Sequence, residues 1–374
     1  MVVASPTSTL PATRGATAAA AAGPSSFIRD ARRVIRRAER PGRGVASMAV
    51  SEAVSVSPLE GERVRKLLGL LKLGNEPQAR FGPTGCVLAA RFADSLGDIR
   101  AFEVRDDDVW VVTPPKCGTT WTQEMVYLLL NDLNYEEAKK APLYKRSPFF
   151  EYTRFAPKEI IEEEMDIDTL EHATTLPSPR CIKSHLHKPL LPEQLWTKKA
   201  KVVYVAREPK DTAVSFYHHY KLLSGYTGDK DFFFECFYEG LVEHSPLWEH
   251  VLEFWKIKDQ PNILFNTYEE MKEDLPAVVQ RTAKFLGKSL TEAQLTRLVE
   301  HLDIKQMKRN PATNYEDLFT KAREEGRISD DQAFIRKGVV GEGRREMSPE
   351  MAARFDERTR RVFNEAVGGC PWQI

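Results

Sequence analysis

An excess of charge of either sign is missing from this sequence, because 54 lysine and arginine residues balance 54 aspartate and glutamate residues. Proteins that attract nucleic acids or membrane surfaces electrostatically usually carry a net positive charge. The sequence also lacks a run of about 18 apolar residues, which a membrane-spanning helix needs. We therefore expect no nucleic-acid partner and no membrane partner, and any anion site must be a local arrangement of side chains.

Paired cysteine motifs are missing as well. The five cysteines are widely scattered, and none has the CxxC spacing: Cys86, Cys117, Cys181, Cys236 and Cys370. This pattern supports neither a zinc knuckle nor a disulfide framework. We expect free thiols in a reducing compartment, and hence a cytoplasmic protein. With 42% hydrophobic residues, the chain can form a sizeable soluble core.

The N-terminal region, residues 1–60, differs in composition from the rest. A low-complexity Ala/Ser/Thr/Pro stretch at 7–26 is followed by the arginine-rich "FIRDARRVIRRAER" at 27–40, whose apolar residues share one helical face. Such a pattern resembles a mitochondrial presequence, which gives a mitochondrial location as the alternative. The simpler interpretation, which we favour, is a disordered extension that precedes a single domain at residues 61–374, with Met48 as a possible internal start.

Short apolar runs alternate with amphipathic patterns from about residue 80 onwards. Four runs are suited to buried strands, at residues 109–113, 181–184, 201–206 and 262–267. Helical patterns lie between them, and one begins with a proline at residue 209. The alternation predicts an α/β fold in which helices flank a parallel sheet. Ligands of such sheets bind at the carboxyl ends of the strands.

The stretch "TPPKCGTTWTQE" at residues 113–124 lies at one of these strand ends. A helix N-terminus favours an anion through its unpaired N–H groups and its partial positive charge. Gly118 permits close approach of the backbone, Thr119 and Thr120 add hydroxyl donors, and Lys116 adds a full charge. The alternative is an ordinary helix cap with a solvated lysine.

A magnesium-dependent nucleotide kinase is the obvious competing function. Its loop reads GxxxxGK[ST], with the lysine after the glycine. Here Lys116 precedes Gly118, and Arg207 follows the strand at 201–206, where a magnesium-binding enzyme often has aspartate. Basic residues thus stand where a metal would otherwise neutralise phosphates, and we expect an anion site without a metal.

A second candidate pair, Lys183 and His185, lies at the end of the strand at 181–184. Residues two apart on a strand point to the same side. A histidine beside a lysine suits removal of a proton from an acceptor next to developing negative charge. The alternative is a partly buried histidine beside a surface lysine. His185 and His187 could together bind a metal, but no third ligand lies at a spacing that would support a metal site.

Together these stretches resemble the cytosolic sulfotransferase family. "PKCGTTWTQE" is similar to the family's 5′-phosphosulfate loop and "KSHL" to its catalytic strand. "VYVAREPKDTAVSFYHHY" is similar to its 3′-phosphate segment, and "FIRKGVVGE" to the start of its late RKGxxGDWK motif. The resemblance covers about residues 80 to 365. It implies the family's P-loop-like fold and a sulfotransferase that uses 3′-phosphoadenosine 5′-phosphosulfate (PAPS).

The resemblance also implies residue roles. Lys116, Gly118, Thr119 and Thr120 would hold the 5′-phosphosulfate, Trp121 would stack on adenine, and Tyr268 would lie near the base. The residues implied at the 3′-phosphate are Arg207, Ser215, Arg336, Lys337 and Gly338. Lys183 would stabilise the sulfuryl group during transfer, and His185 would be the general base. The roles implied for the two lysines are chemically reasonable, because fixed lysines can stabilise charge that develops in a site shielded from water.

The sequence departs from the family pattern at three places. The GDWK segment reads Gly341-Glu342-Gly343-Arg344 and lacks its tryptophan, and Ile304 replaces an adenine-stacking phenylalanine. These two changes bear on donor affinity. The family's dimer motif KxxxTVxxxE, aligned from Arg344 to Ala353, is not intact. We therefore expect a monomer, or a dimer through another surface.

The acceptor is the least specified part of the site. "RSPFFEY" resembles the family's pocket-lining region, so Phe149 and Tyr152 are expected to face a small apolar or aromatic acceptor that offers a hydroxyl or an amine. Plain core packing is the alternative for both rings. Two other functions stay open: a non-catalytic nucleotide-binding protein of the same fold, and a related dehydratase that acts through a sulfated intermediate.

Overall fold

The computed structural model describes residues 54–157, 167–329 and 331–372. Its central sheet has the strand order β5-β4-β6-β7, and all three strand pairs are parallel. The strands are β4 (Val109–Val112), β5 (Cys181–Ser184), β6 (Lys201–Ala206) and β7 (Ile263–Thr267). The predicted parallel sheet is confirmed, and each strand lies within one residue of its predicted bounds.

A second, antiparallel sheet was not predicted. It has the order β1-β2-β3 and comprises β1 (Val56–Pro58), β2 (Gln78–Phe81) and β3 (Cys86–Ala89). Because β1 pairs with β2, the folded domain begins before the boundary expected at residue 61. The arginine-rich pattern at residues 27–40 lies outside the described residues.

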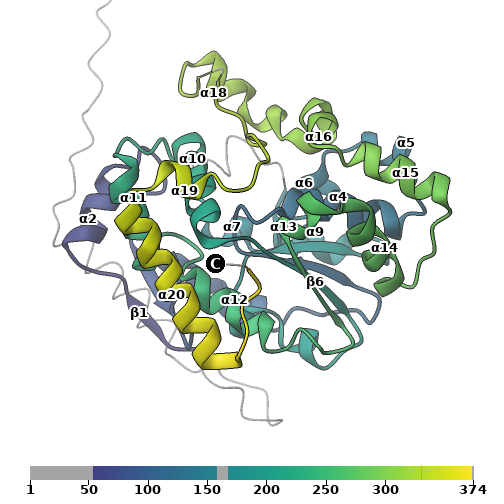
Figure 1. Cartoon of the computed structure of the whole chain (residues 1–374), viewed down its shortest axis with the longest axis horizontal. Coiled ribbons are helices and arrows are strands. Elements are labelled where there is room, and N and C mark those ends of the chain that lie inside the picture. Colours follow the sequence, from purple (N-terminus) through teal and green to yellow (C-terminus); the bar gives the residue numbers. More distant parts are fainter. Residues whose placement is uncertain (1–53, 158–166, 330, 373–374) are drawn as a thin grey trace, which may run out of the picture.

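Helices account for much of the rest of the described residues (Figure 1). In the first half they are α2 (Glu62–Gly69), α3 (Leu96–Arg100), α4 (Thr119–Leu130), α5 (Tyr135–Lys139), α6 (Leu143–Arg146), α7 (Tyr152–Phe155) and α9 (Thr169–Thr175). In the second half they are α10 (Pro209–Leu223), α11 (Lys230–Tyr238), α12 (Leu247–Trp255), α13 (Tyr268–Glu273), α14 (Leu275–Phe285), α15 (Glu292–His301), α16 (Ile304–Arg309), α17 (Pro311–Asn314), α18 (Thr320–Glu324), α19 (Gly343–Glu346) and α20 (Pro349–Val367). Short 3-10 turns lie at Ala90–Ser95, Lys188–Leu190, Glu193–Trp196 and Glu316–Phe319. No helix of the described residues is long and apolar enough to span a membrane.

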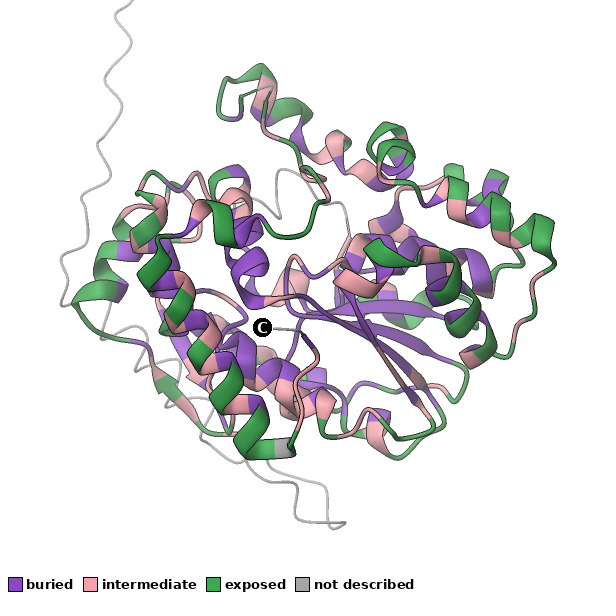
Figure 2. Ribbon diagram, viewed as in Figure 1, coloured by how far each residue is buried: buried purple, intermediate pink, exposed green. Residues whose placement is uncertain are grey.

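The parallel sheet separates two hydrophobic cores, because successive side chains of a strand point to opposite faces. Trp110 and Val112 of β4 pack in the core formed with α10, α11, α12 and α20, whereas Val109 and Val111 pack in the core formed with α4, α14 and α15. Figure 2 shows the central strands as buried. Burial on both faces explains why these strands read as continuous apolar runs.

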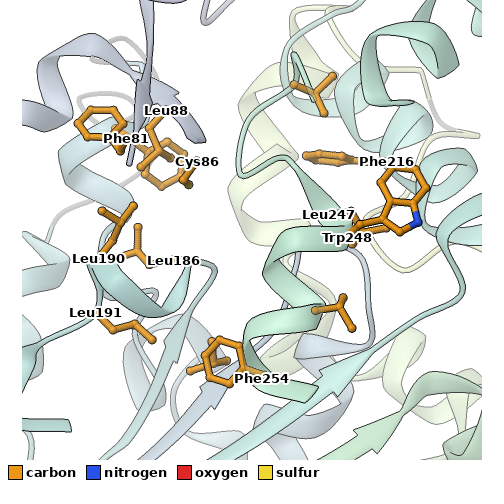
Figure 3. Packing of buried hydrophobic residues seen from close by; sticks show 14 of the residues in the cluster. Phe81, Cys86, Leu88, Leu186, Leu190, Leu191, Phe216, Leu247, Trp248 and Phe254 are labelled. Atoms are coloured by element: carbon orange, nitrogen blue, oxygen red, sulfur yellow. The ribbon is translucent and has the colours of Figure 1, made fainter. Parts of the chain in front are cut away.

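The first core extends from the parallel sheet to the antiparallel one. Phe81 and Leu88 of the small sheet, Leu190 after β5, and Trp248 and Phe254 of α12 belong to this one cluster (Figure 3). The small sheet is therefore attached to the domain through apolar packing. All five cysteines are free, as expected.

A buried ion pair closes the amino-terminal end of the parallel sheet. Arg180 donates to the Asp108 carboxylate through Nε at 2.7 Å and through a terminal nitrogen at 2.5 Å, and both side chains are almost fully buried. Arg180 also donates to the carbonyl oxygens of Ala173 and Glu103. The pair fixes the connections that enter β4 and β5.

We expect Asp108→Ala to lower the free energy of unfolding by about 3–5 kcal/mol, because it leaves the arginine charge buried and unpaired. The neighbouring exposed Asp107 provides a matched control, and Asp107→Ala should change stability by no more than about 0.5 kcal/mol. Urea unfolding followed by circular dichroism measures both. Equal stabilities of the two variants would contradict a structural role for the pair.

Candidate active site

One cavity collects every candidate residue predicted from the sequence. Its lining includes Lys116, Gly118, Thr119, Thr120, Trp121, Phe149, Tyr152, Lys183, His185, Arg207, Ser215, Tyr268, Arg336, Lys337 and Gly338. His185, Arg207 and Tyr268 are the first residues after β5, β6 and β7, respectively. The cavity therefore lies at the carboxyl edge of the parallel sheet, where such folds bind ligands.

The turn between β4 and α4 brings backbone close to this cavity. Lys116 and Gly118 both have positive φ, of 67° and 98°. A Cβ atom at residue 118 would lie 2.9 Å from the Tyr268 ring, so only glycine fits between the turn and that ring. Helix α4 begins at the next residue, Thr119, without a side-chain cap on its N-terminus. Its first N–H groups are thus available to an anion.

Two lysines of the cavity, the buried Lys183 and the partly buried Lys116, have no carboxylate in contact among the described residues. Lys116 Nζ donates to the Phe334 carbonyl oxygen at 3.3 Å and lies over the Phe334 ring, whereas Lys183 Nζ lies 3.8 Å from the centre of the Phe149 ring. Burial, and then the charges of Lys183, Arg207 and Arg336, lower the pKa of Lys116 to about 7. Burial lowers the pKa of Lys183 to about 8, although Glu151 opposes the change. A bound anion would favour the charged form of both lysines.

The hydrogen bonds of His185 fix its tautomer. Nδ1 lies 2.7 Å from the carbonyl oxygen of Thr113, and because a carbonyl only accepts, Nδ1 must carry the proton. Nε2 therefore holds a lone pair, and it makes no hydrogen bond to any described residue. Burial, followed by the charge of Lys183, lowers the pKa of His185 well below its ordinary value. The ring is a neutral base at neutral pH.

The backbone of His185 is held on both sides. Its N–H donates to Oε1 of the buried Glu151 at 2.7 Å, and its carbonyl accepts from His250 Nε2 at 3.1 Å. For Lys183 and His185 to point to the same side as residues of one strand, β5 would have to include His185. The strand ends one residue earlier, at Ser184. The side-chain contact from Glu151 replaces the missing strand pairing, so both residues still reach the cavity.

The basic residues contributed by the distant segments have acidic or carbonyl partners within the described part of the chain. Arg336 and Lys337 both form ion pairs with Glu342, with 3.0 Å between Lys337 Nζ and Oε1. Glu342 is buried, and although burial opposes the change, the hydrogen bonds from these two residues lower its pKa to about 2. Arg207 donates to the carbonyl oxygens of Lys116 and Val339 and lies 3.7 Å from Asp211.

The donor side of the cavity fits a ligand with a flat ring and several charged oxygens. Trp121 and Tyr268 lie edge to face at 5.8 Å, and Arg207 lies over the Tyr268 ring. A Cβ atom at Gly338 would lie 2.8 Å from the Ile304 side chain, which lines the same wall. The indole N–H of Trp121 and the Nε atoms of Arg207 and Arg336 are buried without a partner among the described residues. These orphaned donors are suited to an anionic ligand.

The acceptor side contains residues that the sequence did not indicate. The ring centres of the expected Phe149 and Tyr152 lie 5.4 Å apart, and the rings of Phe155 and His244 pack beside them. The ring centre of His244 is 5.5 Å from that of His185. His219, Tyr220 and Glu243 line the same end. His244 has a φ of 56°, but no local motif marked it. No group of three or more potential metal ligands was found among the residues that the structure describes.

Comparisons with known proteins agree with this geometry. A family model described as "Sulfotransferase domain" matches residues 106–369. The luciferin sulfotransferase of Photinus pyralis is 38% identical over 276 residues, which is 71% of this chain and 74% of that protein. Sulfotransferase 1A1 of Bos taurus is 36% identical over 303 residues, which is 80% of this chain and 97% of that protein.

Solved structures give the same family. Retinol dehydratase, crystallised with androsterone and inactive cofactor PAP (adenosine 3′,5′-bisphosphate), superposes with a TM-score of 0.74 at 30% identity over 87% of this chain and 99% of that one. A mouse sulfotransferase complexed with PAP has a TM-score of 0.57 at 26% identity over 76% of this chain and 95% of that one. The predicted fold class and the predicted family are confirmed, and the chain belongs to the sulfotransferase family and transfers sulfuryl groups from PAPS.

Proposed function

We propose that this protein transfers the sulfuryl group of PAPS to the hydroxyl of a small aromatic or apolar acceptor, with His185 as the general base. The orientation of His185 carries the proposal. The bond from Nδ1 to Thr113 leaves the Nε2 lone pair free, in a cavity that contains Lys183 and aromatic side chains. A non-catalytic nucleotide-binding protein would have no use for this arrangement. An amine acceptor is open to the same chemistry.

The turn after β4 would hold the 5′-phosphosulfate. The N–H groups at the start of α4, the hydroxyls of Thr119 and Thr120, and the Lys116 ammonium supply donors and positive charge there. PAPS supplies the sulfuryl group. Lys116 and Lys183 would stabilise the negative charge that develops on the oxygens during transfer, because both are fixed in a buried site.

The adenosine half would lie against Trp121 and Tyr268, with Ile304 beside Gly338. Arg207 and Ser215 would bind the 3′-phosphate from one side, and Arg336, Lys337 and Gly338 from the other. Two of these cations must first leave Glu342, so the carboxylate competes with the phosphate for the same charges. This competition reduces the binding free energy that the 3′-phosphate would contribute.

A related dehydratase is the second candidate, because the retinol dehydratase structure has a TM-score of 0.74 with this chain. Sulfuryl transfer to an allylic alcohol would then be followed by loss of sulfate from the resulting ester and of a proton from the adjacent carbon chain, which forms a further double bond. An assay of labelled donor against phenols, steroids and an allylic alcohol separates the two functions by product. Sulfate esters support simple transfer, and an alkene with free sulfate supports the dehydratase.

Assembly and location also stay proposals. Pro349 is the first residue of α20 and has no N–H, and Ala353 has no carboxylate for Arg344, so a monomer or a dimer through another surface follows. We propose a cytoplasmic location. The mitochondrial alternative depends on residues that the structure does not describe.

The base is tested by His185→Ala. We expect transfer to fall by roughly two to four orders of magnitude, because general-base removal of the acceptor proton is lost. Binding of adenosine 3′,5′-bisphosphate, measured by calorimetry, should persist. His218→Ala is the matched control, since His218 does not line the cavity. Near-full turnover of His185→Ala would contradict the proposed role.

The protonation state of the base can be measured directly. In the free protein we expect nitrogen NMR signals of His185 to report the neutral tautomer with the proton on Nδ1. This signal should persist as the pH falls through the ordinary value of 6.5, because burial and Lys183 lower the pKa. Since the neutral ring is the base, acidification removes the base only well below that pH. Titration near 6.5 would show that the ring is not held as described.

Calorimetry with adenosine 3′,5′-bisphosphate and with AMP tests the 3′-phosphate residues. Binding of the 3′-phosphate must break the Glu342 ion pairs, and this cost lowers the preference for the bisphosphate. We expect the remaining preference to be about 1.5–3 kcal/mol, which is about tenfold to a hundredfold in affinity. Arg207→Ala and Arg336→Ala should remove most of it. Glu342→Gln should instead increase it, because the competing charge is gone.

Arg344→Ala is the control for these arginine variants. Its side chain is 64% exposed and lies outside the cavity, so both affinities should be nearly unchanged. Equal binding of the two nucleotides by the unmodified protein would overturn the assignment of these residues.

A further inference from the structure

The acceptor side of the cavity contains one acidic side chain that the proposed mechanism does not use. Among the cavity-lining residues that the structure describes, Glu243 is the sole carboxylate. It lies in the connection between α11 and α12, directly before His244. The donor side of the same cavity is positively charged through Lys116, Lys183 and Arg207. The cavity is therefore electrostatically polarised, with its negative group at the acceptor side.

Glu243 is partly exposed, and its carboxylate differs from those of the other glutamates near the site. Glu151, Glu253 and Glu269 each accept a hydrogen bond from a backbone N–H, of His185, Lys188 and Glu208 respectively. The Glu243 carboxylate accepts no hydrogen bond and forms no ion pair within the described part of the chain. Arg91, whose charge opposes the rise in the pKa of Glu243, is itself paired with Glu76, with 2.9 Å between Arg91 Nε and Glu76 Oε2. A carboxylate that lines a largely apolar cavity and has no partner there favours a ligand that supplies a positive charge or a hydrogen-bond donor.

The backbone around Glu243 is fixed. Its N–H donates to the Tyr220 hydroxyl at 2.8 Å. The N–H of the next residue, His244, donates to the carbonyl oxygen of Val87 in β3 at 2.8 Å. The His244 ring packs against Phe155 at 4.9 Å and lies 5.5 Å from the His185 ring. Glu243 is thus held one residue from the wall that faces the base, and burial raises the pKa of its carboxyl to about 7.

This arrangement suits an acceptor with two polar ends. A phenol hydroxyl would reach Nε2 of His185 while the aromatic ring lies among Phe149, Tyr152 and Phe155. A protonated alkylamine on the opposite side of the ring would meet the unpaired carboxylate. A neutral hydroxyl could donate one hydrogen bond but would leave the charge uncompensated.

We propose that Glu243 is a specificity-determining residue that binds the protonated amine of an arylalkylamine acceptor whose phenol hydroxyl receives the sulfuryl group. The inference rests on the proposed function, because it needs His185 to act on the hydroxyl end.

Three matched acceptors test this inference: 4-(2-aminoethyl)phenol, 4-(2-hydroxyethyl)phenol and 4-ethylphenol. They share the phenol and differ only in the group at the far end. With saturating PAPS at pH 7.5, where an alkylamine is protonated, we expect kcat/KM of the amine to exceed that of 4-ethylphenol at least about tenfold. The difference should lie mainly in KM, because the amine is remote from the reacting oxygen.

Glu243→Gln keeps the size of the side chain and removes its charge. We expect this variant to bring the ratio of the amine to 4-ethylphenol to within about threefold of one, while kcat/KM for 4-ethylphenol changes by less than about threefold. Glu253→Gln is the matched control, because Glu253 is also mostly buried but does not line the cavity. It should keep the wild-type preference.

The outcomes separate this inference from the function beneath it. An unmodified protein that sulfates 4-ethylphenol and 1-naphthol without favouring the amine would overturn the inference and leave the proposed function intact. A preference for the hydroxyethyl compound over the amine, or a preference that survives Glu243→Gln, would overturn it as well. Failure to sulfate any of the phenols would instead contradict the proposed function.

Discussion

The arrangement of this site depends on positive charge that the fold buries at the ends of its strands. Lys116 lies in the turn after β4, Lys183 lies near the end of β5, and Arg207 directly follows β6. A parallel sheet brings these strand ends together whether or not the charges attract. The core and the helices supply the free energy that holds mutually repelling groups in place. Affinity for a polyanion is then a property of the scaffold, because the repulsion is already present before the donor binds.

Some of that charge is balanced internally. Glu342 pairs with Arg336 and Lys337, whereas Lys116 and Lys183 contact aromatic rings and a carbonyl oxygen in place of a carboxylate. The two ends of the donor site therefore differ in kind. The end near His185 has cations without a carboxylate partner in the described residues, and at the proposed 3′-phosphate end the phosphate would replace the Glu342 carboxylate. In that case the carboxylate would pair with the same cations again when the nucleotide product leaves.

The sequence predicted the parallel sheet well because strands buried on both faces appear as unbroken apolar runs. It did not predict the small antiparallel sheet, whose strand β1 has only three residues and follows a low-complexity stretch. That Lys116 and Gly118 lie in a turn at a strand end could be predicted, because turn chemistry is local. The place of Glu243 and His244 in the cavity lining could not, because it depends on tertiary contacts with Tyr220 and Val87. The pairing of Glu342 was missed for a similar reason, since charge compensation depends on the path of the loop between residues 334 and 343.

The attachment of His244 to the small sheet has a consequence for how such an enzyme can diversify. The wall of the acceptor pocket is bonded through residues 244 and 245 to Val87 of β3, whereas the base and the donor turn are bonded to the parallel sheet through Thr113. The proposed acceptor wall and the proposed base are thus supported by different sheets of one domain. Under the proposed function, substitutions that shift the small sheet would change the shape of the acceptor wall more than the position of the turn after β4.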